Sequence, residues 1–293
     1  MMTEEKIREY SDKEIPNKLD ELGKNVYYSN LTYMHEAFGD NVEYERLFHQ
    51  TLLCPETEEY LYRTPAPTAY EWGSRPILEV EVERATKGCT TETEKALALM
   101  CYIRDLKEKS HGYDYFYGGT EEDLIKKGER YCERVARLMC GLCDIVGLPA
   151  RVIFHLSGGH LTSEVFADGK WRYIDPRFGL FYLDESGELM SVAEIMKNPE
   201  VIFNQPKWVY DYGSREYTPE FMAEENYEKY LRPGEIQLFG DYRLADAEKY
   251  GYHYEWMPSA RYPNEKRDTA HRAYVEALTA YIAATPAKKR QKD

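Results

Sequence analysis

Cysteine, histidine and aspartate side chains can carry out nucleophilic acyl transfer together, and the middle of the chain offers Cys132, His160 and Asp175. A carboxylate that binds one imidazole nitrogen fixes the tautomer of the ring and leaves the other nitrogen as a base. Cys132 lies at the start of a segment that we expect to be helical, where unpaired N–H groups and the helix dipole favour a thiolate. The same N–H groups can stabilise an oxyanion. Cys140 and Cys143 lie deeper in that segment, where neither advantage applies.

A predicted hairpin brings the histidine next to the aspartate. Asp168-Gly169 is a strong signal for a two-residue turn between the segments 160–167 and 170–175. With this turn, His160 and Asp175 become diagonal neighbours on one face of the ladder, close enough for a hydrogen bond. The face with His160 and Asp175 also carries Glu164, Phe166, Trp171 and Tyr173. The opposite face carries the apolar residues Leu161, Val165 and Ile174. A histidine that faces a carboxylate is often structural, so spacing alone leaves that interpretation open.

Two helices and a further strand should position these residues. Thr91 to Glu94 fit a capping box, and apolar residues follow at helical spacing: Ala96, Met100, Ile103 and Leu106. A second helix should run from about Gly128 to Val146 and end at Gly147 and Pro149. One face of that helix would hold Val135, Met139, Leu142, Cys143 and Val146. A strand over 150–156 should follow.

The flanking segments give weaker patterns. Residues 63–76 are rich in proline and glycine and indicate a loop, and Ile77–Val82 alternates like a short strand. Ser191 should cap a short helix that ends at Pro199. Asp268 can cap a final helix with one apolar face formed by Ala270, Tyr274, Val275, Leu278 and Ile282. We therefore divide the chain into an N-terminal extension of helix and loop (1–75), a catalytic core (76–200) and a tyrosine-rich C-terminal extension that ends in a helix (201–293).

Composition excludes several classes of protein. The 293 residues carry a net charge of −14 and the sequence pI is about 5.1, which argues against nucleic-acid and anionic-membrane partners because both need a clustered positive surface. The first thirty residues have no signal-peptide pattern, and no apolar run reaches the length of about 18 residues that a transmembrane helix needs. We therefore expect a cytoplasmic protein whose six cysteines are free thiols. The sequence leaves the oligomeric state open.

The pair Cys140 and Cys143 forms a CxxC motif, which invites a redox or zinc interpretation. A redox motif should open a helix, whereas this one falls inside the predicted helix. A zinc site could recruit His155 and His160, but His160 already has a better role. We therefore expect both thiols to pack in the core, and we expect no metal and no other cofactor. His155 alternates with Ile153 on a strand and should be structural, although a cleft position stays open.

The stretch around Cys132 resembles the cysteine helix of the transglutaminase-like superfamily. The motifs that carry the resemblance are GERYCERVARLMCGLCDIVGLPARVIF (128–154), Gly159-His160 with Glu164-Val165, Gly169-Lys-Trp171 and Asp175-Pro176. The resemblance covers roughly residues 90–185 and includes the capped helix Glu92–Lys109. It implies an α+β fold with a papain-like core, in which the cysteine helix packs on an antiparallel sheet.

The resemblance also implies roles for individual residues. Cys132 would be the nucleophile, His160 the base and Asp175 the residue that orients the histidine. The backbone N–H of Cys132 would form half of an oxyanion hole, and the candidates for the other half or for the adjoining cleft wall are Tyr113, Tyr115, Tyr117 and Tyr131. Further residues assigned to the cleft are Thr162, Glu164 and Trp171. Two positions depart from the family pattern, since many relatives have glycine at the place of Arg130 and an aromatic residue at the place of Thr162.

Two classes of function follow from the resemblance. The first is an enzyme that acts on amide bonds through a thioester, either a hydrolase (amidase or peptidase) or an acyltransferase of the transglutaminase type. The second is a non-catalytic peptide- or glycan-binding module on the same fold. The intact triad favours an enzyme, and family analogy favours hydrolysis because nothing resembles the calcium-binding or β-sandwich additions of large crosslinking enzymes. The expected partner is a peptide, protein or small amide, and the acidic surface favours neutral or basic ones.

Overall fold

The computed structural model describes residues 21–22, 24–25, 28–29, 32, 36, 51–53, 58–59, 61–109, 120–129, 131–155, 158–214, 217–232, 235, 237–240 and 265–284. The elements are β1 (Thr51–Leu52), α5 (Pro76–Ala85), α6 (Glu92–Asp105), η2 (Leu106–Lys109), α7 (Glu121–Lys127), α8 (Cys132–Ile145), β2 (Ala150–His155), β3 (His160–Ala167), β4 (Lys170–Ile174), α9 (Val192–Lys197), η3 (Pro199–Asn204), α10 (Lys207–Gly213), α11 (Pro219–Glu225), η4 (Asn226–Tyr230), β5 (Gln237–Gly240) and α12 (Glu265–Ala284).

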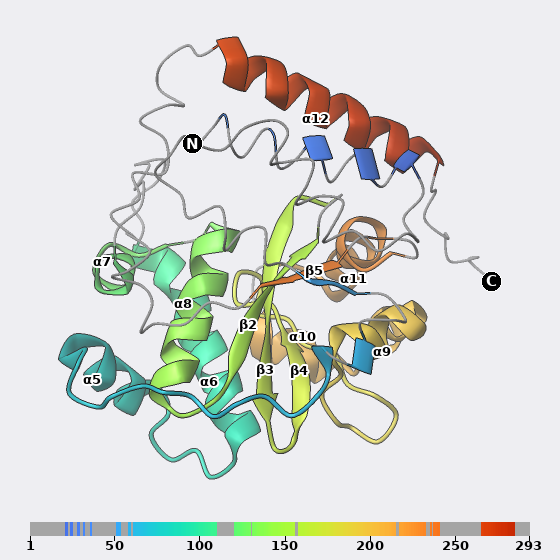
Figure 1. Cartoon of the computed structure of the whole chain (residues 1–293). Coiled ribbons are helices and arrows are strands. Elements are labelled where there is room, and N and C mark those ends of the chain that lie inside the picture. Colours follow the sequence, from blue (N-terminus) through green and yellow to red (C-terminus); the bar gives the residue numbers. More distant parts are fainter. Residues whose placement is uncertain are drawn as a thin grey trace.

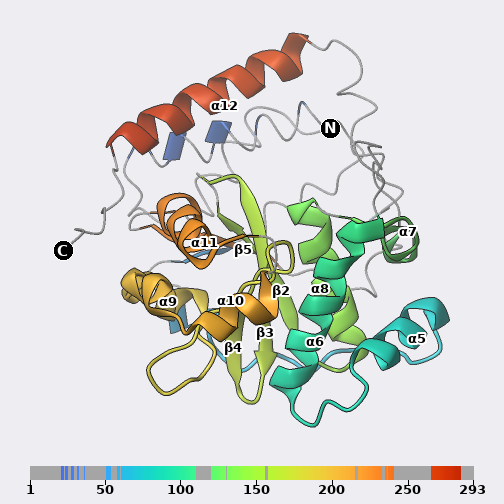
Figure 2. The same ribbon diagram turned by 180° about the vertical axis from the view of Figure 1, so that it is seen from behind.

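One antiparallel sheet organises the fold. Its five strands follow the order β1-β5-β2-β3-β4, so that three consecutive strands form a meander and β5 joins it beside β2. Helices α5 to α8 lie on one side of the strands and α9 to α11 on the other, while α12 crosses one end of the molecule (Figures 1 and 2). The fold is therefore α+β with the cysteine helix α8 packed on an antiparallel sheet, as the resemblance implies.

An apolar core lies on each face of the sheet, because successive side chains of each strand point to opposite faces. Val165 and Ile174 pack with α5, α6 and α8 in the first core, together with Leu78, Leu99, Leu138 and Leu142. Tyr173 and Ile153 face the second core, together with Tyr182, Ile195, Tyr227 and Phe239. Segments assigned to the two sequence extensions contribute to this second core and to the sheet, since β1 and β5 come from opposite ends of the chain.

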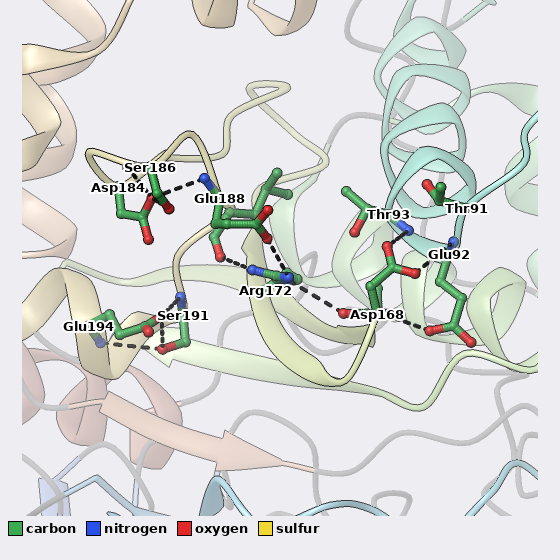
Figure 3. Close-up of polar contacts among 12 residues, drawn as sticks. Thr91, Glu92, Thr93, Asp168, Arg172, Asp184, Ser186, Glu188, Ser191 and Glu194 are labelled. Atoms are coloured by element: carbon green, nitrogen blue, oxygen red, sulfur yellow. Dashed lines mark hydrogen bonds and ion pairs between the residues drawn. The ribbon is translucent and has the colours of Figure 1, made fainter.

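The hairpin between β3 and β4 forms in the predicted register. Asp168 has φ 49° and Gly169 has φ 79°, the left-handed conformation that a type I′ turn requires at both positions. Ala167 pairs with Lys170, and Ser163 pairs with Ile174. The Asp168 carboxylate also accepts hydrogen bonds from the N–H groups of Thr93, at 3.0 Å, and of Glu92 (Figure 3). The turn therefore ties the hairpin to the first turn of α6.

Local capping signals predict several helix starts correctly. Thr91 with Glu94 and Ser191 with Glu194 form the two expected capping boxes at α6 and α9. Figure 3 shows the second of these. The structure adds a third box at α7, which Thr120 caps. Helix α8 begins at Cys132, four residues later than predicted, buries Val135, Met139, Leu142 and Cys143 of the predicted face, and ends before Gly147, whose φ is 81°. None of the described helices has both the length and the apolar composition that a membrane crossing requires.

The strand predicted over Ile77–Val82 is wrong, because this segment forms helix α5. Leu78 and Val82, one turn apart, are buried, whereas Ile77 and Val80 are each 61% exposed. Pro76 occupies the first turn, and the Glu79 carboxylate accepts hydrogen bonds from the N–H groups before the helix. These helix-start interactions outweigh a six-residue alternation that also fits one helical face.

The final helix also differs from its prediction. Helix α12 begins at Glu265, so Asp268 lies within its first turn instead of capping it. Among the side chains described in this helix, those of Ala270, Ala277 and Tyr281 are buried, while Val275 of the predicted apolar face is 43% exposed. At the buried Tyr281, the Arg232 guanidinium lies 5.6 Å from the centre of the ring. The side chains of Leu278 and Ile282 lie outside the described residues.

A close backbone contact braces the turn after β4. The N–H of Gly179 donates to the Asp175 carbonyl at 2.8 Å, and a Cβ atom at Gly213 would lie 1.6 Å from the carbonyl oxygen of Gly179. The buried Arg104 of α6 donates to the carbonyls of Tyr212 and Gly213 at 2.8 and 2.7 Å. The turn is thereby held against the C-terminal end of α10.

We predict that Gly213→Ala lowers the free energy of unfolding by about 1–3 kcal/mol, because the added methyl group forces apart two backbone segments. Urea unfolding followed by circular dichroism measures the change. Asp211→Ala is the matched control, since Asp211 is exposed in the same helix and its loss should cost about 0.5 kcal/mol or less. Equal stability of Gly213→Ala and the unmodified protein would contradict the contact.

Candidate active site

A buried hydrogen bond joins the histidine and the aspartate. His160 Nε2 lies 2.7 Å from Asp175 Oδ2, and the two side chains are 1% and 0% exposed. The second carboxylate oxygen of Asp175 accepts hydrogen bonds from the N–H groups of Arg177, at 2.9 Å, and Phe178, at 3.1 Å. Both oxygens of the carboxylate therefore have partners, and the contact that the hairpin geometry predicts is present.

The pair shifts the titration of both groups. Burial alone would lower the pKa of His160, but the charge of Asp175, the hydrogen bond to it and the neighbouring Cys132 side chain raise that pKa to about 9. Burial would raise the pKa of Asp175, but His160, the Phe178 N–H and the charge of Arg177 hold it below its ordinary value. At neutral pH the two side chains therefore form a charged pair.

Cys132 is the first residue of α8 and contacts the same histidine. Its side chain is half-buried. Because Nε2 of His160 already binds Asp175, Nδ1 is the nitrogen left for the sulfur, and this buried atom has no hydrogen-bond partner among the described residues. The three residues that the sequence singles out are thus brought together in the order sulfur, imidazole, carboxylate.

The start of α8 is anchored by a buried ion pair. Glu129 accepts hydrogen bonds from the Tyr131 N–H at 3.0 Å and from the Arg134 guanidinium at 2.8 Å. The same guanidinium lies 5.2 Å from the centre of the Tyr131 ring. As the first helical residue, Cys132 has a backbone N–H with no carbonyl one turn earlier to bind. This N–H is available to a developing oxyanion.

The second oxyanion donor stays a prediction. Tyr131 is the N-cap residue of α8 and is half-buried next to Cys132, with its ring against Arg134. The other three candidates, Tyr113, Tyr115 and Tyr117, lie outside the described residues.

Aromatic rings that the sequence did not single out surround His160. The Tyr230 ring lies 4.4 Å from the imidazole, between centroids, and the Phe178 ring lies 5.3 Å from it. Tyr230 belongs to η4, and a Cβ atom at Gly158 would lie 2.5 Å from its ring, so that the β2–β3 turn packs directly on this segment. No local signal could have found Tyr230, because it is 70 residues away in sequence; Phe178 could have been found from its place in the turn after Asp175.

His155 supports the site structurally, as the sequence analysis favours. Its Nε2 binds the Thr162 hydroxyl at 2.8 Å, and its ring stacks on His160 with centroids 6.0 Å apart. Burial and the neighbouring His160 lower the pKa of His155 to about 3, so this ring is neutral at physiological pH. A neutral ring can lie next to the charged His160 without repulsion.

The structure corrects the assignment of Thr162, Glu164 and Trp171 to a cleft, because these side chains are 0%, 0% and 7% exposed. The Glu164 carboxylate pairs with Arg151 and also accepts hydrogen bonds from the Tyr62 hydroxyl and the Val192 N–H. The Trp171 ring lies 3.9 Å from the Arg151 guanidinium. Alternation along the strands does place Thr162, Glu164 and Trp171 on the sheet face that was predicted for them. Helix α9 and residues 61–63, however, cover that part of the face.

The other described cysteines occupy different environments. Cys140 and Cys143 are buried in the cores on either side of α8, as core packing predicts, and burial raises the pKa of the Cys143 thiol. Cys89 and Cys101 are half-buried and form no disulfide with another described cysteine. The described residues contain no group of three or more His, Cys, Asp or Glu side chains that could hold a metal ion. Cys54 lies outside the described residues.

The part of the chain that holds Cys132, His160 and Asp175 matches a known protein family. Residues 81–176 match the model of the transglutaminase-like superfamily. This segment is a transglutaminase-like core. The match begins within α5 and ends just after Asp175, so it includes Cys132 and His160 and confirms the resemblance seen in the sequence. Members of the superfamily are generally cysteine-dependent enzymes. No curated protein and no solved structure shows significant similarity to the chain.

The raised pKa of His160 predicts a pH dependence of stability. Protonated His160 stabilises the fold fully below pH 6.5, its ordinary pKa, and this contribution is lost as the pH rises through about 9. The free energy of unfolding should therefore fall between pH 6.5 and 9.5, by on the order of 2 kcal/mol from this group. Urea unfolding at both pH values measures the fall, and His160→Gln should remove that part of it. Identical pH slopes for the two proteins would contradict the charged pair.

Proposed function

We propose that the protein is a cysteine-dependent hydrolase that cleaves amide bonds through a thioester, as an amidase or peptidase. The observation that carries the proposal is the shared position of His160, which binds Asp175 through Nε2 and also contacts the Cys132 sulfur. A nucleophile, a base and a group that orients the base are the three parts that such chemistry needs. The transglutaminase-like core around them supports an enzyme of this class.

The first half of the reaction forms the thioester. His160 holds a proton at neutral pH, so the Cys132 sulfur attacks the carbonyl carbon of the amide as a thiolate that faces the imidazolium. The oxyanion that forms accepts a hydrogen bond from the Cys132 N–H at the start of α8. The intermediate then breaks its C–N bond as His160 gives its proton to the leaving nitrogen, so that ammonia or an amine leaves. The raised pKa of His160 favours the state in which the ring holds this proton.

The second half of the reaction releases the acyl group. Water loses a proton to His160 and attacks the thioester carbonyl, and the C–S bond breaks to yield a carboxylic acid and the Cys132 thiolate. Asp175 keeps its hydrogen bond to Nε2 throughout and balances the charge on the ring.

Two alternatives use the same chain differently. An amine in place of water would make the protein an acyltransferase of the transglutaminase type, and the thioester chemistry is common to both. A peptide- or glycan-binding module needs no triad, but it is favoured by a run of exposed aromatic side chains on α10, α11 and the segment between them: Trp208, Tyr212, Tyr217 and Phe221. The burial of a charged His–Asp pair next to a thiol favours the enzyme.

We predict that Cys132→Ala and His160→Ala abolish turnover because each removes a reacting group, and that only His160→Ala also lowers the free energy of unfolding, since it leaves the buried Asp175 carboxylate without its partner. Asp175→Asn should lower kcat by about a hundredfold or more yet leave measurable activity, since it removes only the orientation and charge of the base. A fluorogenic-amide screen measures hydrolysis, and incorporation of a fluorescent amine measures acyl transfer.

Cys89→Ser is the matched control for these variants, because it removes a half-buried thiol that is far from Cys132 in the sequence. It should leave kcat unchanged. Circular dichroism and the urea midpoint show that each variant folds. Full activity of Cys132→Ala would overturn the triad. Amine incorporation that exceeds hydrolysis would identify the acyltransferase, and binding without any turnover by the unmodified protein would identify the binding module.

A further inference from the structure

Arg177 lies at the edge of the proposed active site. Its backbone N–H donates to Asp175, which fixes the position of the residue relative to the triad. Its exposed guanidinium lies 4.9 Å from the centre of the Phe178 ring, and that ring lies 5.3 Å from the ring of His160. A single aromatic side chain therefore separates this cation from the proposed base.

Arg177 has no carboxylate partner within the described residues, a lack that it shares with Arg272 of α12, whose guanidinium donates to the Thr269 hydroxyl. Eight arginines in the described part of the chain form ion pairs with Asp or Glu: Arg75, Arg84, Arg104, Arg134, Arg137, Arg151, Arg172 and Arg232. The guanidinium of Arg177 has no such partner within the described residues, although the chain has 52 acidic against 38 basic side chains. Its charge nevertheless reaches the site, because it helps to lower the pKa of Asp175.

An apolar surface continues from this cation. The Phe178 ring contacts Tyr217 at 5.8 Å, and Tyr217 stacks on Phe221 at 5.4 Å, between centroids. Tyr217 and Phe221 are 40% and 51% exposed. An exposed guanidinium beside such rings suits an organic anion, whose apolar part can contact the rings while its charge pairs with the arginine.

We propose that Arg177 binds a carboxylate of the substrate, which makes peptides with a carboxylate near the scissile amide the preferred substrates. This inference rests on the proposed function and names its substrate class. The two ring contacts place the guanidinium carbon no more than about 10 Å from His160, the length of roughly three extended residues. The carboxylate is either the C-terminus of a peptide or the side chain of Asp or Glu.

The net charge of the protein limits the number of carboxylates that a preferred substrate can carry. A net charge of −14 repels strongly acidic peptides, whereas Arg177 pairs locally with one carboxylate. The substrate class is thus a peptide with a single carboxylate close to the cleaved bond. This differs from the neutral or basic substrates that the net charge alone favours.

Two matched sets of peptides test the inference. The first set places Asp or Glu, or the neutral Asn or Gln, at each of three positions before a fluorogenic amide. The second set consists of internally quenched fluorescent peptides that end, up to three residues after the scissile bond, in either a free carboxylate or a carboxamide. We expect kcat/KM to be about tenfold higher for the carboxylate member in one set, and this set identifies the source of the carboxylate. Raising the salt concentration should reduce the ratio.

Variants that change the charge of Arg177 test whether this residue causes the preference for the carboxylate peptide. Arg177→Gln should bring the ratio close to one, and Arg177→Lys should keep part of it because the charge remains. Lys87→Gln is the matched control, since it removes the same charge from an exposed residue after α5 and should keep the full ratio. A ratio near one in the unmodified protein, or one that Arg177→Gln does not change, would overturn the inference while hydrolysis itself still supports the proposed function.

A binding measurement separates this inference from the proposed function. Fluorescence anisotropy with the Cys132→Ala variant, which should not turn over, reports the affinity for the same peptides. About tenfold tighter binding of the carboxylate peptide, lost in Cys132→Ala/Arg177→Gln, supports the inference even if the unmodified protein hydrolyses nothing. Equal affinity for both peptides, or binding of neither, overturns it.

Discussion

The buried hydrogen bond between His160 and Asp175 is the interaction on which the rest of the structure depends. A carboxylate and an imidazolium taken out of water lose hydration worth several kcal/mol each, and only close pairing with full hydrogen bonding repays that loss. Asp175 meets the requirement with His160 on one oxygen and two backbone N–H groups on the other. Removing either partner would leave an uncompensated charge in the core, so every neighbouring element must keep the two residues in register.

The surrounding elements can be understood as supports for this pair. The type I′ turn at 168–169 sets the register of β3 against β4, and its aspartate is fastened to the start of α6. The next turn packs at Gly179 against Gly213, whose carbonyl Arg104 binds, and against the Arg104 side chain itself. Tyr230 and His155 enclose the imidazole ring, and α8 brings Cys132 to it at the helix start, where a backbone N–H has no carbonyl one turn earlier to bind.

Sequence reasoning succeeds where the determinants are local. The Asp-Gly turn, the capping boxes and the period of α8 each lie within a few residues, and together they predict the meander and the meeting of His160 with Asp175. It fails where distant segments decide. The strands β1 and β5, the ring of Tyr230 and the burial of Glu164 under α9 depend on contacts between residues far apart in sequence. Helix α5 is an intermediate case, in which Glu79 outweighs a short alternation.

The central claim is that position makes Cys132 the reactive thiol. Three described cysteines, Cys89, Cys101 and Cys132, are similarly half-buried, but of these three only Cys132 starts a helix beside an imidazole. Competitive labelling of the folded protein with limiting iodoacetamide at neutral pH, followed by peptide mass spectrometry, compares them directly. We expect Cys132 to react at least about tenfold faster than the other two, and to lose that advantage in His160→Ala. Earlier labelling of Cys89, Cys101, Cys140 or Cys143 would contradict the account.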